Sequence, residues 1–521
     1  MRYLVTGEQM KEIDGYTIGT VGIPSLVLME RAAMAVAREA EKLAGKADSI
    51  WAVCGTGNNG ADGVAAARML ALKGYSVTVI LAGSEERGTR EFHTQLEIAR
   101  KLGLSIAEWK DFIPGRCGLV IDGIFGVGLS REVEGEYREI LEKISSMEVP
   151  VVAVDIPSGI HSTTGQVMGA AVKAAVTVTF GWEKLGSVLY PGREYCGRVV
   201  IEDIGFPPVS FQKAGPSAWT YEKEDLSGLP LRSPGGNKGT FGKVLLIAGS
   251  KGMSGAACLA ALAAYRMGAG MVKIMTVEDN RTILQQLLPE AMVTSYEPEE
   301  VTGSESHAGF PDDSEKSCCA AWERRMEREC AWADVIVAGP GLGQEPHVRF
   351  LIRSLLTSVY VPVVLDADAL NTMARYPELE QYYTENIIIT PHLGEMSRLT
   401  GRSVEEIQKR VADTATEYGS RHGIVCVLKD AATVVAGRDG QCYVNTSGNS
   451  CMAKAGSGDV LAGTIAGLLA QKMEPFDAAA LGVYVHGLAG DRYRAKHGPA
   501  GMLARELAEE LENITKEGDR R

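Results

Sequence analysis

Residues 449–463 (NSCMAKAGSGDVLAG) join a glycine-containing turn and one carboxylate to the start of an apolar stretch. Gly456 and Gly458 permit a tight turn, and residues 460–469 (VLAGTIAGLL) predict a buried helix. The N–H groups at such a helix N-terminus suit a phosphate, which would repel Asp459 in the same turn. We therefore expect Asp459 to accept a proton from a hydroxyl, although Asp is also common in the first turn of ordinary helices.

Polar residues follow three short apolar stretches in the first half of the chain. They are Asn58, Asn59 and Asp62 after SIWAVC, Asp122 after GLVI, and Asp155 and Ser158 after VVAV. Turns are rich in Asp and Asn, so a chance arrangement is the alternative. Three such turns at the carboxyl ends of parallel strands indicate a ligand site. The oxygens of Asn59, Asp122 and Ser158 suit a hard monovalent or divalent cation.

The second half of the chain repeats this arrangement. GPGLG (339–343), DADAL (366–370), TPHLGEMSRL (390–399) and Lys429 each follow an apolar stretch. A single His or Lys at a strand end is usually just solvated. Because these segments converge on one sheet edge, we expect His392, Glu395, Arg398 and Lys429 to belong to a site.

Short apolar strands alternating with helices must position these residues. The expected strands are 49–54, 77–82, 119–121, 151–154, 176–180, 244–248, 334–338, 361–365, 386–390 and 424–428, and the expected helices include 22–43, 64–73, 90–102, 137–147 and 256–268. This order predicts an α/β protein with a parallel, doubly wound sheet in each half. A polar stretch with Pro and Gly reaches residue 236, so we expect domains at 1–212 and 213–521. Residues 297–329 are polar and predict an exposed insertion.

Composition excludes several classes of protein. The net charge of −13 and the absence of a basic run argue against nucleic acid and anionic membranes as partners, which leaves small molecules. Ten cysteines without a CxxC pair fit neither a zinc site nor a disulfide framework and indicate a reducing cytoplasm. No segment has about 18 uninterrupted apolar residues, so no membrane span is expected.

Gly55, Gly57 and Gly60 match the GxGxxG spacing of dinucleotide dehydrogenases. That class also needs an acid at the end of the second strand to bind ribose. The candidate, Glu85, lies beyond Gly83 in an expected loop. The spacing alone is therefore a weak signal.

The first 210 residues or so resemble the NAD(P)H-hydrate epimerase domain. The similar segments are GTGNNGADG (55–63), DGIFGVGLSREVEG (122–135), AVDIPSGI (153–160) and TFGWEKLGSVLYPGREYCG (179–197). The resemblance implies that Asp155 is the acid–base residue and that Asn59, Asp122 and Ser158 bind potassium. It implies a substrate site made of Asn58, Asn59, Gly60, Ala61, Asp62, Gly126, Val127, Gly128, Leu129, Ser130, Arg131, Glu132, Tyr137 and Asp155, with Lys184 nearby.

Residues 237–501 resemble the ribokinase-like superfamily and, within it, the ADP- or ATP-dependent NAD(P)H-hydrate dehydratases. This resemblance implies a C-terminal α/β/α sandwich beside an N-terminal Rossmann-like doubly wound sheet. The similar segments are GSKGMSGAA, AGPGLG, LDADALN, TPHLGEMSRL and NSCMAKAGSGDVLAG. The resemblance implies catalysis by Asp459, with magnesium accompanying the nucleotide. It implies that the hydrated substrate contacts Gly255, Gly341, His392, Leu393, Gly394, Glu395, Met396, Ser397, Arg398 and Asp459. It implies that the nucleotide contacts Lys429, Asp430, Ala431, Ala432, Thr433, Asn449, Ser450, Cys451, Met452, Ala453, Lys454, Ala455, Gly456, Ser457 and Gly458.

Two departures from this pattern stand outside the GSGD core. Lys429-Asp430 replaces the family's usual Lys-Gly and adds a carboxylate near the expected phosphates, and Asn237-Lys238-Gly239 replaces a frequent His-Lys-Gly.

Together the two resemblances imply a cytoplasmic enzyme that repairs hydrated nicotinamide cofactors. It would interconvert the two epimers of NAD(P)H hydrate and dehydrate one of them with ADP or ATP. A homo-oligomer is expected. Two alternatives remain: a ribokinase-type small-molecule kinase with an N-terminal dinucleotide-binding module, and a dinucleotide sensor without turnover. The sequence does not choose between ADP and ATP, or between the NADH and NADPH hydrates.

Overall fold

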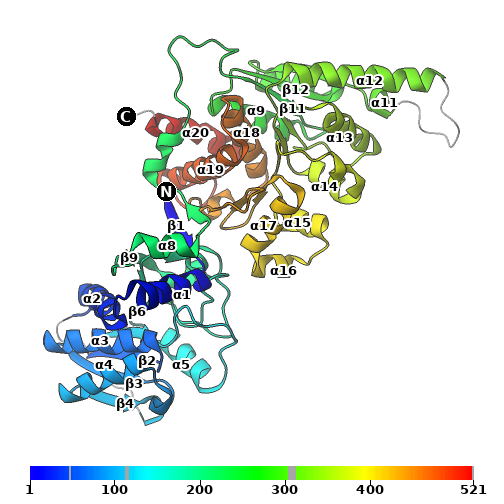
Figure 1. Cartoon of the computed structure of the whole chain (residues 1–521). Helices are drawn as coiled ribbons and strands as arrows, with labels where there is room; N and C mark the ends of the chain where they lie inside the picture. Colours follow the sequence, from blue (N-terminus) through cyan, green and yellow to red (C-terminus); the bar gives the residue numbers. More distant parts are fainter. Residues whose placement is uncertain (46–48, 112–116, 303–312, 519–521) are drawn as a thin grey trace. The chain divides into compact units, whose positions relative to one another are not determined.

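The computed structural model describes residues 1–45, 49–111, 117–302 and 313–518. The chain folds into two compact units. One unit is Tyr3–Ala218, and the other is Trp219–Arg521 together with Met1–Arg2. Both units are drawn in Figure 1.

The unit Tyr3–Ala218 is built on a seven-stranded sheet in which every neighbouring pair of strands is parallel. Its order is β4 (Ser105–Glu108), β3 (Ser76–Leu81), β2 (Ser49–Cys54), β5 (Leu119–Gly123), β6 (Val151–Val154), β7 (Val176–Phe180) and β9 (Arg198–Glu202). The chain moves outward from β2 through β3 to β4 and then returns to start β5 on the other side. This confirms the predicted doubly wound fold and places the switch point, where ligands bind in such sheets, between β2 and β5.

Helices cover both faces of this sheet. On one face, α2 (Ser25–Leu43), α3 (Asn58–Leu72) and α4 (Arg90–Lys101) bury an alternating set of strand residues that includes Ile50 and Ala52. On the other, α5 (Gly135–Ser145) packs on Trp51 and Val53. The period-two alternation along β2 thus supplies two cores, as a doubly wound sheet requires.

The predicted start of the second helix at Val64 is wrong, because α3 begins at Asn58. Gly60 lies so close to the end of β2 that a Cβ there would be 1.7 Å from the backbone oxygen of Gly55. The glycines of this segment therefore let the helix begin directly beneath the strand. Asn58 and Asn59 lie in the first turn of α3.

Several elements of this unit were not predicted. The helix α1 (Gly7–Tyr16) begins with a capping box in which Thr6 and Gln9 bond each other's backbone N–H groups. It packs on α8 (Pro208–Ala214). The strand β1 (Arg2–Val5) pairs in parallel with β8 (Glu183–Lys184), matching Val5 with Lys184. Short helices α6 (Leu185–Val188) and α7 (Gly192–Cys196) follow β8.

The second unit contains a mixed sheet that is parallel over its first seven strands. Their order is β13 (Met292–Tyr296), β12 (Met271–Val277), β11 (Lys243–Ile247), β14 (Val335–Ala338), β15 (Val363–Leu365), β16 (Ile387–Ile389) and β17 (Val425–Leu428). The strands β18 (Val434–Ala436) and β19 (Cys442–Val444) continue the sheet in antiparallel register. The switch point again lies beside the first strand, between β11 and β14.

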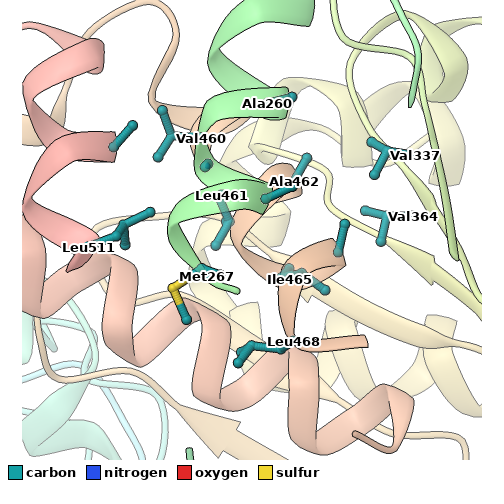
Figure 2. Close-up of a cluster of buried hydrophobic side chains, with 14 of the residues drawn as sticks. Ala260, Met267, Val337, Val364, Val460, Leu461, Ala462, Ile465, Leu468 and Leu511 are labelled. Carbon is teal, nitrogen blue, oxygen red and sulfur yellow. The ribbon is translucent and has the colours of Figure 1, made fainter. Parts of the chain in front are cut away.

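One face of this sheet is covered by α9 (Ser254–Arg266), α18 (Ser457–Ala470), α19 (Pro475–His497) and α20 (Ala504–Gly518). Figure 2 shows Val460, Leu461 and Ile465 of α18 in this core. Gly463 of α18 lies so close to α9 that a Cβ would be 2.1 Å from the backbone oxygen of Ala260. Burying each large aliphatic side chain contributes about 1.5–3 kcal/mol, so α18 is firmly anchored behind its N-terminus.

Six further helices of this unit lie between other strands of the sheet. They are α10 (Arg281–Leu287), α13 (Pro346–Ser358), α14 (Asp368–Arg375), α15 (Leu393–Thr400), α16 (Val404–Lys409) and α17 (Val411–His422). Strand residues Leu245 and Ile247 are fully buried but do not belong to the core that faces α18. Helices therefore cover both faces, which confirms the predicted α/β/α arrangement.

The expected exposed insertion at 297–329 is wrong for its helical part. The helix α12 (Asp313–Trp332) follows α11 (Pro298–Thr302), with residues 303–312 outside the described part of the chain. Trp322 and Met326 of α12 are buried, and the Trp322 ring packs 5.6 Å from that of Tyr296. The reason is that Trp322, Met326 and Cys330 recur every four residues and form one apolar stripe.

Within the described residues, no helix is long and apolar enough to cross a membrane. The eight cysteines whose side chains are described are free.

Candidate active sites

The N-terminal unit has a cavity of about 620 Å³ at the carboxyl edge of its sheet. Most of the residues predicted for the first site line it: Asn58, Asn59, Asp62, Gly126, Val127, Gly128, Leu129, Ser130, Arg131, Tyr137, Asp155 and Lys184. Gly60, Ala61 and Glu132 do not line it. Gly60 and Ala61 are buried against the end of β2, so their contribution is to the position of α3.

Asp155 follows β6 in a strained conformation, with a φ of 67° that is rare for a non-glycine residue. Its backbone N–H donates to the oxygen of Val178 (2.7 Å), which fixes the strained turn to β7. Lys184 Nζ donates to Asp155 Oδ1 in a short contact, and also to Thr179 Oγ1 (2.9 Å) and to the oxygen of Phe180 (3.1 Å). All three protons of the ammonium are thus bound, and Lys184 is only 1% exposed.

Only one oxygen of Asp155 is used by these contacts. Oδ1 also accepts hydrogen bonds from Thr179 Oγ1 (3.2 Å) and from the N–H of Phe180 (3.3 Å). Among the described residues, Oδ2 has no donor. Because Asp155 lines the cavity, Oδ2 is the oxygen available to a ligand there.

Two further carboxylates line the same cavity. Burial raises the pKa of Asp62 well above its usual value, and the charges of Asp155 and Asp14 add to the effect. Asp14 on α1 also has a raised pKa, mainly from burial and then from Asp155. Asp14 could not be identified from the sequence, because nothing in the GEQMKEIDGY segment distinguishes it from the other acidic residues.

Asp122 and Ser158 form a tight pair beneath the cavity. Ser158 donates to Asp122 through its hydroxyl (2.6 Å) and through its backbone N–H (2.8 Å). Burial raises the pKa of Asp122 to about 6, although the hydrogen bonds from Ser158 oppose this rise. The N–H of Phe125 in turn donates to Ser158 Oγ (2.8 Å).

Asn59 provides a test of whether a cation fits here. Its side-chain nitrogen Nδ2 is buried and has no hydrogen-bond partner among the described residues. Amide oxygen and nitrogen exchange places by a rotation, so this buried position suits a carbonyl oxygen facing a cation. With one carboxylate, one hydroxyl and one amide, the donor set fits a cation of low charge.

In the second unit, the GSGD turn lies at the N-terminus of α18. Gly456 is the N-cap residue and has a φ of 93°, a conformation that favours glycine. Ser457 is the first helical residue, so Asp459 lies in the first turn, as the sequence predicted. His486 of α19 is buried, burial lowers its pKa to about 4, and its Nε2 contacts the oxygen of Ser457 (3.0 Å). The neutral ring therefore donates to this carbonyl and supports the turn.

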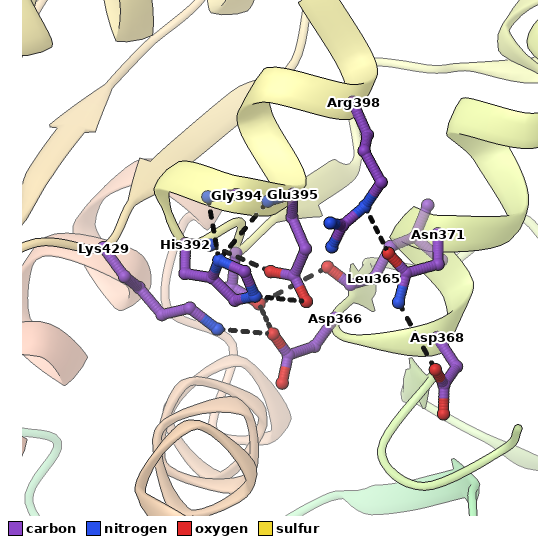
Figure 3. A network of polar contacts seen from close by, with 10 residues as sticks. Leu365, Asp366, Asp368, Asn371, His392, Gly394, Glu395, Arg398 and Lys429 are labelled. Carbon is purple, nitrogen blue, oxygen red and sulfur yellow. Dashed lines mark hydrogen bonds and ion pairs between the residues drawn. The ribbon is translucent and has the colours of Figure 1, made fainter. Parts of the chain in front are cut away.

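Figure 3 shows the polar network beside this turn. Lys429 follows β17 and donates to Asp366 Oδ1 (2.7 Å), which also accepts from Thr390 Oγ1 (2.7 Å). A Cβ on Gly458 would lie 3.3 Å from Lys429 Nζ and 3.8 Å from Asp366 Oδ2. The Lys429–Asp366 pair is therefore packed against the first turn of α18, immediately beside Asp459.

This environment sets the protonation of Asp459. Burial raises its pKa to about 7, the charge of Asp366 adds to the rise, and Lys429 opposes it. Burial alone would lower the pKa of Lys429, but Asp366 and Glu395 raise it overall. An aspartate that titrates near neutral pH is suited to accept a proton from a hydroxyl.

His392 is the N-cap residue of α15. Its Nδ1 accepts the N–H groups of Gly394 (2.9 Å) and Glu395 (3.3 Å), while Glu395 Oε2 accepts the N–H of His392 (2.9 Å). Burial raises the pKa of Glu395 to about 7 and lowers that of His392. The cap fixes the proton of the neutral ring on Nε2, which lies 3.4 Å from Glu395 Oε1.

The segments predicted to bind the nucleotide flank the GSGD turn. Asp491 of α19 holds the start of the segment 449–458. Its Oδ1 accepts a hydrogen bond from Asn449 Nδ2 (2.8 Å), and its Oδ2 accepts one from the N–H of Gly448 (2.8 Å). Asp430 follows Lys429, and burial raises its pKa. Ala432 and Cys451 are buried, so only their backbone can contribute to binding. Asp366, His486 and Asp491 had no assigned role in the sequence analysis because each acts through another residue.

Each unit thus carries an aspartate suited to proton transfer at the carboxyl edge of a parallel sheet, which defines a two-domain α/β enzyme with two separate sites. Matches to protein-family models cover residues 25–186 (YjeF-related protein N-terminus) and 244–513 (NAD(P)H-hydrate dehydratase). The chain is 38% identical to the bifunctional NAD(P)H-hydrate repair enzyme Nnr of Moorella thermoacetica, covering 99% of both chains. It is 37% identical to that of Thermofilum pendens, covering 95% of this chain and 93% of the relative.

The protein belongs to the family of bifunctional NAD(P)H-hydrate repair enzymes. A crystal structure of the ADP/ATP-dependent NAD(P)H-hydrate dehydratase from Bacillus subtilis, co-crystallised with ATP and Mg²⁺, is 34% identical to this chain. The match covers 58% of this chain and 98% of that one, with a TM-score of 0.48.

Proposed function

We propose that this enzyme repairs hydrated NADH and NADPH, interconverting the two epimers at C6 in its N-terminal unit and dehydrating the S epimer in its C-terminal unit with ADP or ATP. The observation that carries the proposal is the position of Asp459 in the first turn of α18 beside the Lys429–Asp366 pair, where burial raises its pKa to about 7. The family relationship supports the same function over a ribokinase-type kinase that releases a stable phosphorylated product.

The dehydration needs a better leaving group than hydroxide. We propose that Asp459 removes the proton of the C6 hydroxyl while the hydroxyl oxygen attacks the terminal phosphoryl group of the nucleotide, whose bond to the bridging oxygen breaks so that AMP leaves from ADP, or ADP from ATP. The N–H groups at residues 456–458 would stabilise the charge that develops on that phosphoryl group. The C6–O bond then breaks, phosphate leaves with both bonding electrons, and loss of a ring proton restores the dihydronicotinamide. Magnesium bound with the nucleotide would neutralise part of the phosphate charge.

The remaining predicted contacts are proposed on the same basis. His392 to Arg398, with Gly255 and Gly341, would hold the hydrate, and residues 429–433 and 449–458 would hold the nucleotide. Asp430 replaces a small residue near the phosphates, and its raised pKa reduces the repulsion that its charge would cause. Lys429 is bound to Asp366, so its positive charge is positioned before the nucleotide arrives.

In the N-terminal unit we propose that Asp155 is the acid–base residue of epimerisation. Its free Oδ2 is available at the cavity, where it would take the proton of the C6 hydroxyl as the C6–N1 bond opens to give an aldehyde; after rotation, N1 attacks the other face of C6 and the proton returns to the oxygen. Lys184 holds the carboxylate in the required orientation. The residues that line the cavity, including Asn58, Asp62, Tyr137 and residues 126–131, would bind the dinucleotide.

The test of the proposed function is incubation with each epimer of NADH hydrate, with and without ADP. We expect epimer exchange in both conditions and recovery of the reduced-nicotinamide absorbance only with ADP or ATP. A stable phosphorylated product would instead support the kinase. Binding of the hydrate and nucleotide with neither reaction would support a sensor.

We also propose that Asn59, Asp122 and Ser158 hold potassium. We expect epimerisation to fall when potassium is replaced by a bulky organic cation, while ADP-dependent dehydration of the S epimer continues. The measurement is chromatography of the two epimers over time. Unchanged epimerisation would leave these three residues as structural turn residues.

Two further expectations from the sequence stay predictions: the cytoplasmic location of the protein and its assembly into a homo-oligomer.

A further inference from the structure

A second cavity, of about 530 Å³, lies in the C-terminal unit beside the predicted substrate residues. It is lined by Gln344, Asn371, Ala374, Arg375 and Arg398. Two of these five side chains are guanidinium groups, two are neutral amides, and none is a carboxylate. Arg398 was predicted from the sequence to contact the substrate, whereas Gln344, Asn371 and Arg375 had no predicted role.

Neither arginine forms an ion pair with a carboxylate among the described residues, although the charge of Arg398 acts on Glu395 and the chain as a whole carries a charge of −13. Arg349 is a useful contrast, because this arginine lies over the Tyr376 ring and is paired with Glu378 (2.9 Å). Arg375 lies 5.5 Å from the same ring without a partner of that kind. An acidic protein that keeps two unpaired guanidinium groups around one cavity creates a local site for an anion.

Neighbouring contacts orient Arg398. Its Nε donates to Asn371 Oδ1 (2.9 Å), and Asn371 Nδ2 donates to Asp368 Oδ1 (3.3 Å). Asp368 Oδ2 accepts the N–H of Gly343 (2.8 Å), which ties this chain of contacts to the loop after β14. The terminal nitrogens of Arg398 remain available, in the fork geometry that matches phosphate oxygens.

The position of the cavity relates it to the dehydration site. In Figure 3 the Lys429–Asp366 pair and the Arg398–Asn371 pair lie on opposite sides of Glu395. The first pair packs against the GSGD turn, and the second lines the cavity. A molecule that reacts at Asp459 and extends past Glu395 would therefore bring its far end to the two arginines.

We propose that this cavity binds a phosphate group of the hydrated dinucleotide, with Arg375 and Arg398 as its charged donors. The proposal rests on the proposed function and adds a phosphate subsite to it. Two phosphate sources fit this chemistry: the diphosphate bridge, which both hydrates carry, and the 2′-phosphate, which only the NADPH hydrate carries. Gln344 and Asn371 supply neutral donors at the same cavity.

A purely structural role for Arg375 is the alternative. It is the last residue of α14, where a positive charge interacts favourably with the helix dipole. A lysine would serve that role equally, but it lacks the planar fork that binds two phosphate oxygens. Arg375→Lys therefore separates the two roles.

The test compares Arg375→Met and Arg375→Lys with Arg353→Met, an exposed arginine of α13 outside the cavity. Dehydration is measured with the S epimer of each hydrate and saturating ADP. We expect Arg375→Met to raise KM for hydrate about 10-fold or more, as for loss of a charge-assisted hydrogen bond, with kcat and KM for ADP unchanged. Arg375→Lys should lie between it and the wild type, and Arg353→Met should match the wild type.

The two substrates identify the phosphate. An equal rise in KM for both hydrates assigns the cavity to the diphosphate bridge, and a rise for the NADPH hydrate alone assigns it to the 2′-phosphate. Unchanged KM for both hydrates, or a rise in KM for ADP instead, would overturn the proposal. Calorimetric titration of the wild type and Arg375→Met with the NADPH hydrate without ADP measures binding apart from turnover. The N-terminal site is common to both proteins, so the difference between them reports on the cavity even if neither protein reacts, an outcome that would refute the function.

Discussion

The two candidate catalytic aspartates both lie beside a lysine, which is fully buried for Lys184 and half-buried for Lys429, but the lysines are bound differently. Lys184 donates directly to Asp155. Lys429 donates to Asp366, and among the described residues Asp459 has no ion pair of its own. A lysine that binds a carboxylate directly stabilises the negative charge of that carboxylate. When the lysine binds a neighbouring carboxylate instead, the catalytic carboxylate also feels the negative charge of that neighbour.

This difference between the lysines gives the two aspartates different properties: the surroundings of Asp459 adjust its pKa, and those of Asp155 fix its orientation. In the C-terminal unit, burial and Asp366 bring the pKa of Asp459 to about 7, where a base is effective at ordinary pH. In the N-terminal unit, the ion pair and the strained backbone of Asp155 fix one carboxylate oxygen and leave the other free. An aspartate and a lysine thus form a base with a raised pKa in the C-terminal unit and a base with a fixed orientation in the N-terminal unit.

The largest expected effect comes from removing each carboxylate in turn. Asp459→Asn keeps the shape of the side chain but loses the base, so ADP-dependent dehydration should fall by about 10² to 10⁴-fold. Epimer exchange should continue, because Asp155 lies in the other unit. Chromatography of both epimers over time measures the two reactions together.

Asp155→Asn is the matched variant and should do the reverse. The S epimer should disappear at the normal rate with ADP, while the R epimer lingers and decays only as fast as it epimerises without help. Loss of both reactions from either single substitution, in a protein that remains folded, would refute two independent sites.

The next effect concerns the direct ion pair. Lys184→Met leaves the buried Asp155 carboxylate without its cation, and breaking a buried pair in this way destabilises a protein by about 3–5 kcal/mol. Lys173→Met, at an exposed lysine of the same unit, is the control. In a background that keeps Trp51 as its single tryptophan, denaturant unfolding followed by fluorescence measures the N-terminal unit, where Trp51 is buried.

Adding Asp155→Asn to Lys184→Met should recover part of this stability, because the uncompensated charge is then gone. An unfolding free energy equal to that of the control would show that the Lys184 contact contributes little to the fold, and the rigid description of Asp155 would fail.

The sequence was sufficient for the architecture and for most of the residues around each site. Apolar strands alternating with helices gave both parallel sheets, and the polar residues after those strands came to the same sheet edge, since parallel strands end together. Asp122 and Ser158 hydrogen-bond each other although they are 36 residues apart in the chain, and Asn59 lies against Gly126 at the edge of the same cavity.

Long-range side-chain pairing was beyond the sequence. Asp14 reaches the cavity of the N-terminal unit because α1 packs on α8, and no pattern in α1 distinguishes Asp14 from the neighbouring acidic residues. DADAL was recognised as a source of acids, but the bond between Lys429 and Asp366 joins residues 63 positions apart, which follow β17 and β15 with β16 lying between these strands. The stripe on α12 was visible as spacing, yet its polar composition suggested a solvated segment.

The smallest expected effect concerns Asp366, the second carboxylate that is present beside Asp459 and has no counterpart in the contacts of Asp155. Asp366→Asn removes the negative charge beside Asp459 and retains an oxygen for Lys429. The pKa of Asp459 should therefore fall. Because the base acts when deprotonated, wild-type dehydration should rise with pH through about 7, and in the variant the rise should occur at lower pH.

The measurement is the pH profile of kcat with saturating hydrate and ADP, with Asp439→Asn at an exposed hairpin as the control. The two profiles should differ most on the acid side and least above about pH 8, where Asp459 is ionised in both proteins. A midpoint that stays in place would mean that burial alone sets the pKa of Asp459. A midpoint that moves to higher pH would show that Lys429 leaves the site when Asp366 is neutral, so that the comparison of the two lysines would need to be reversed.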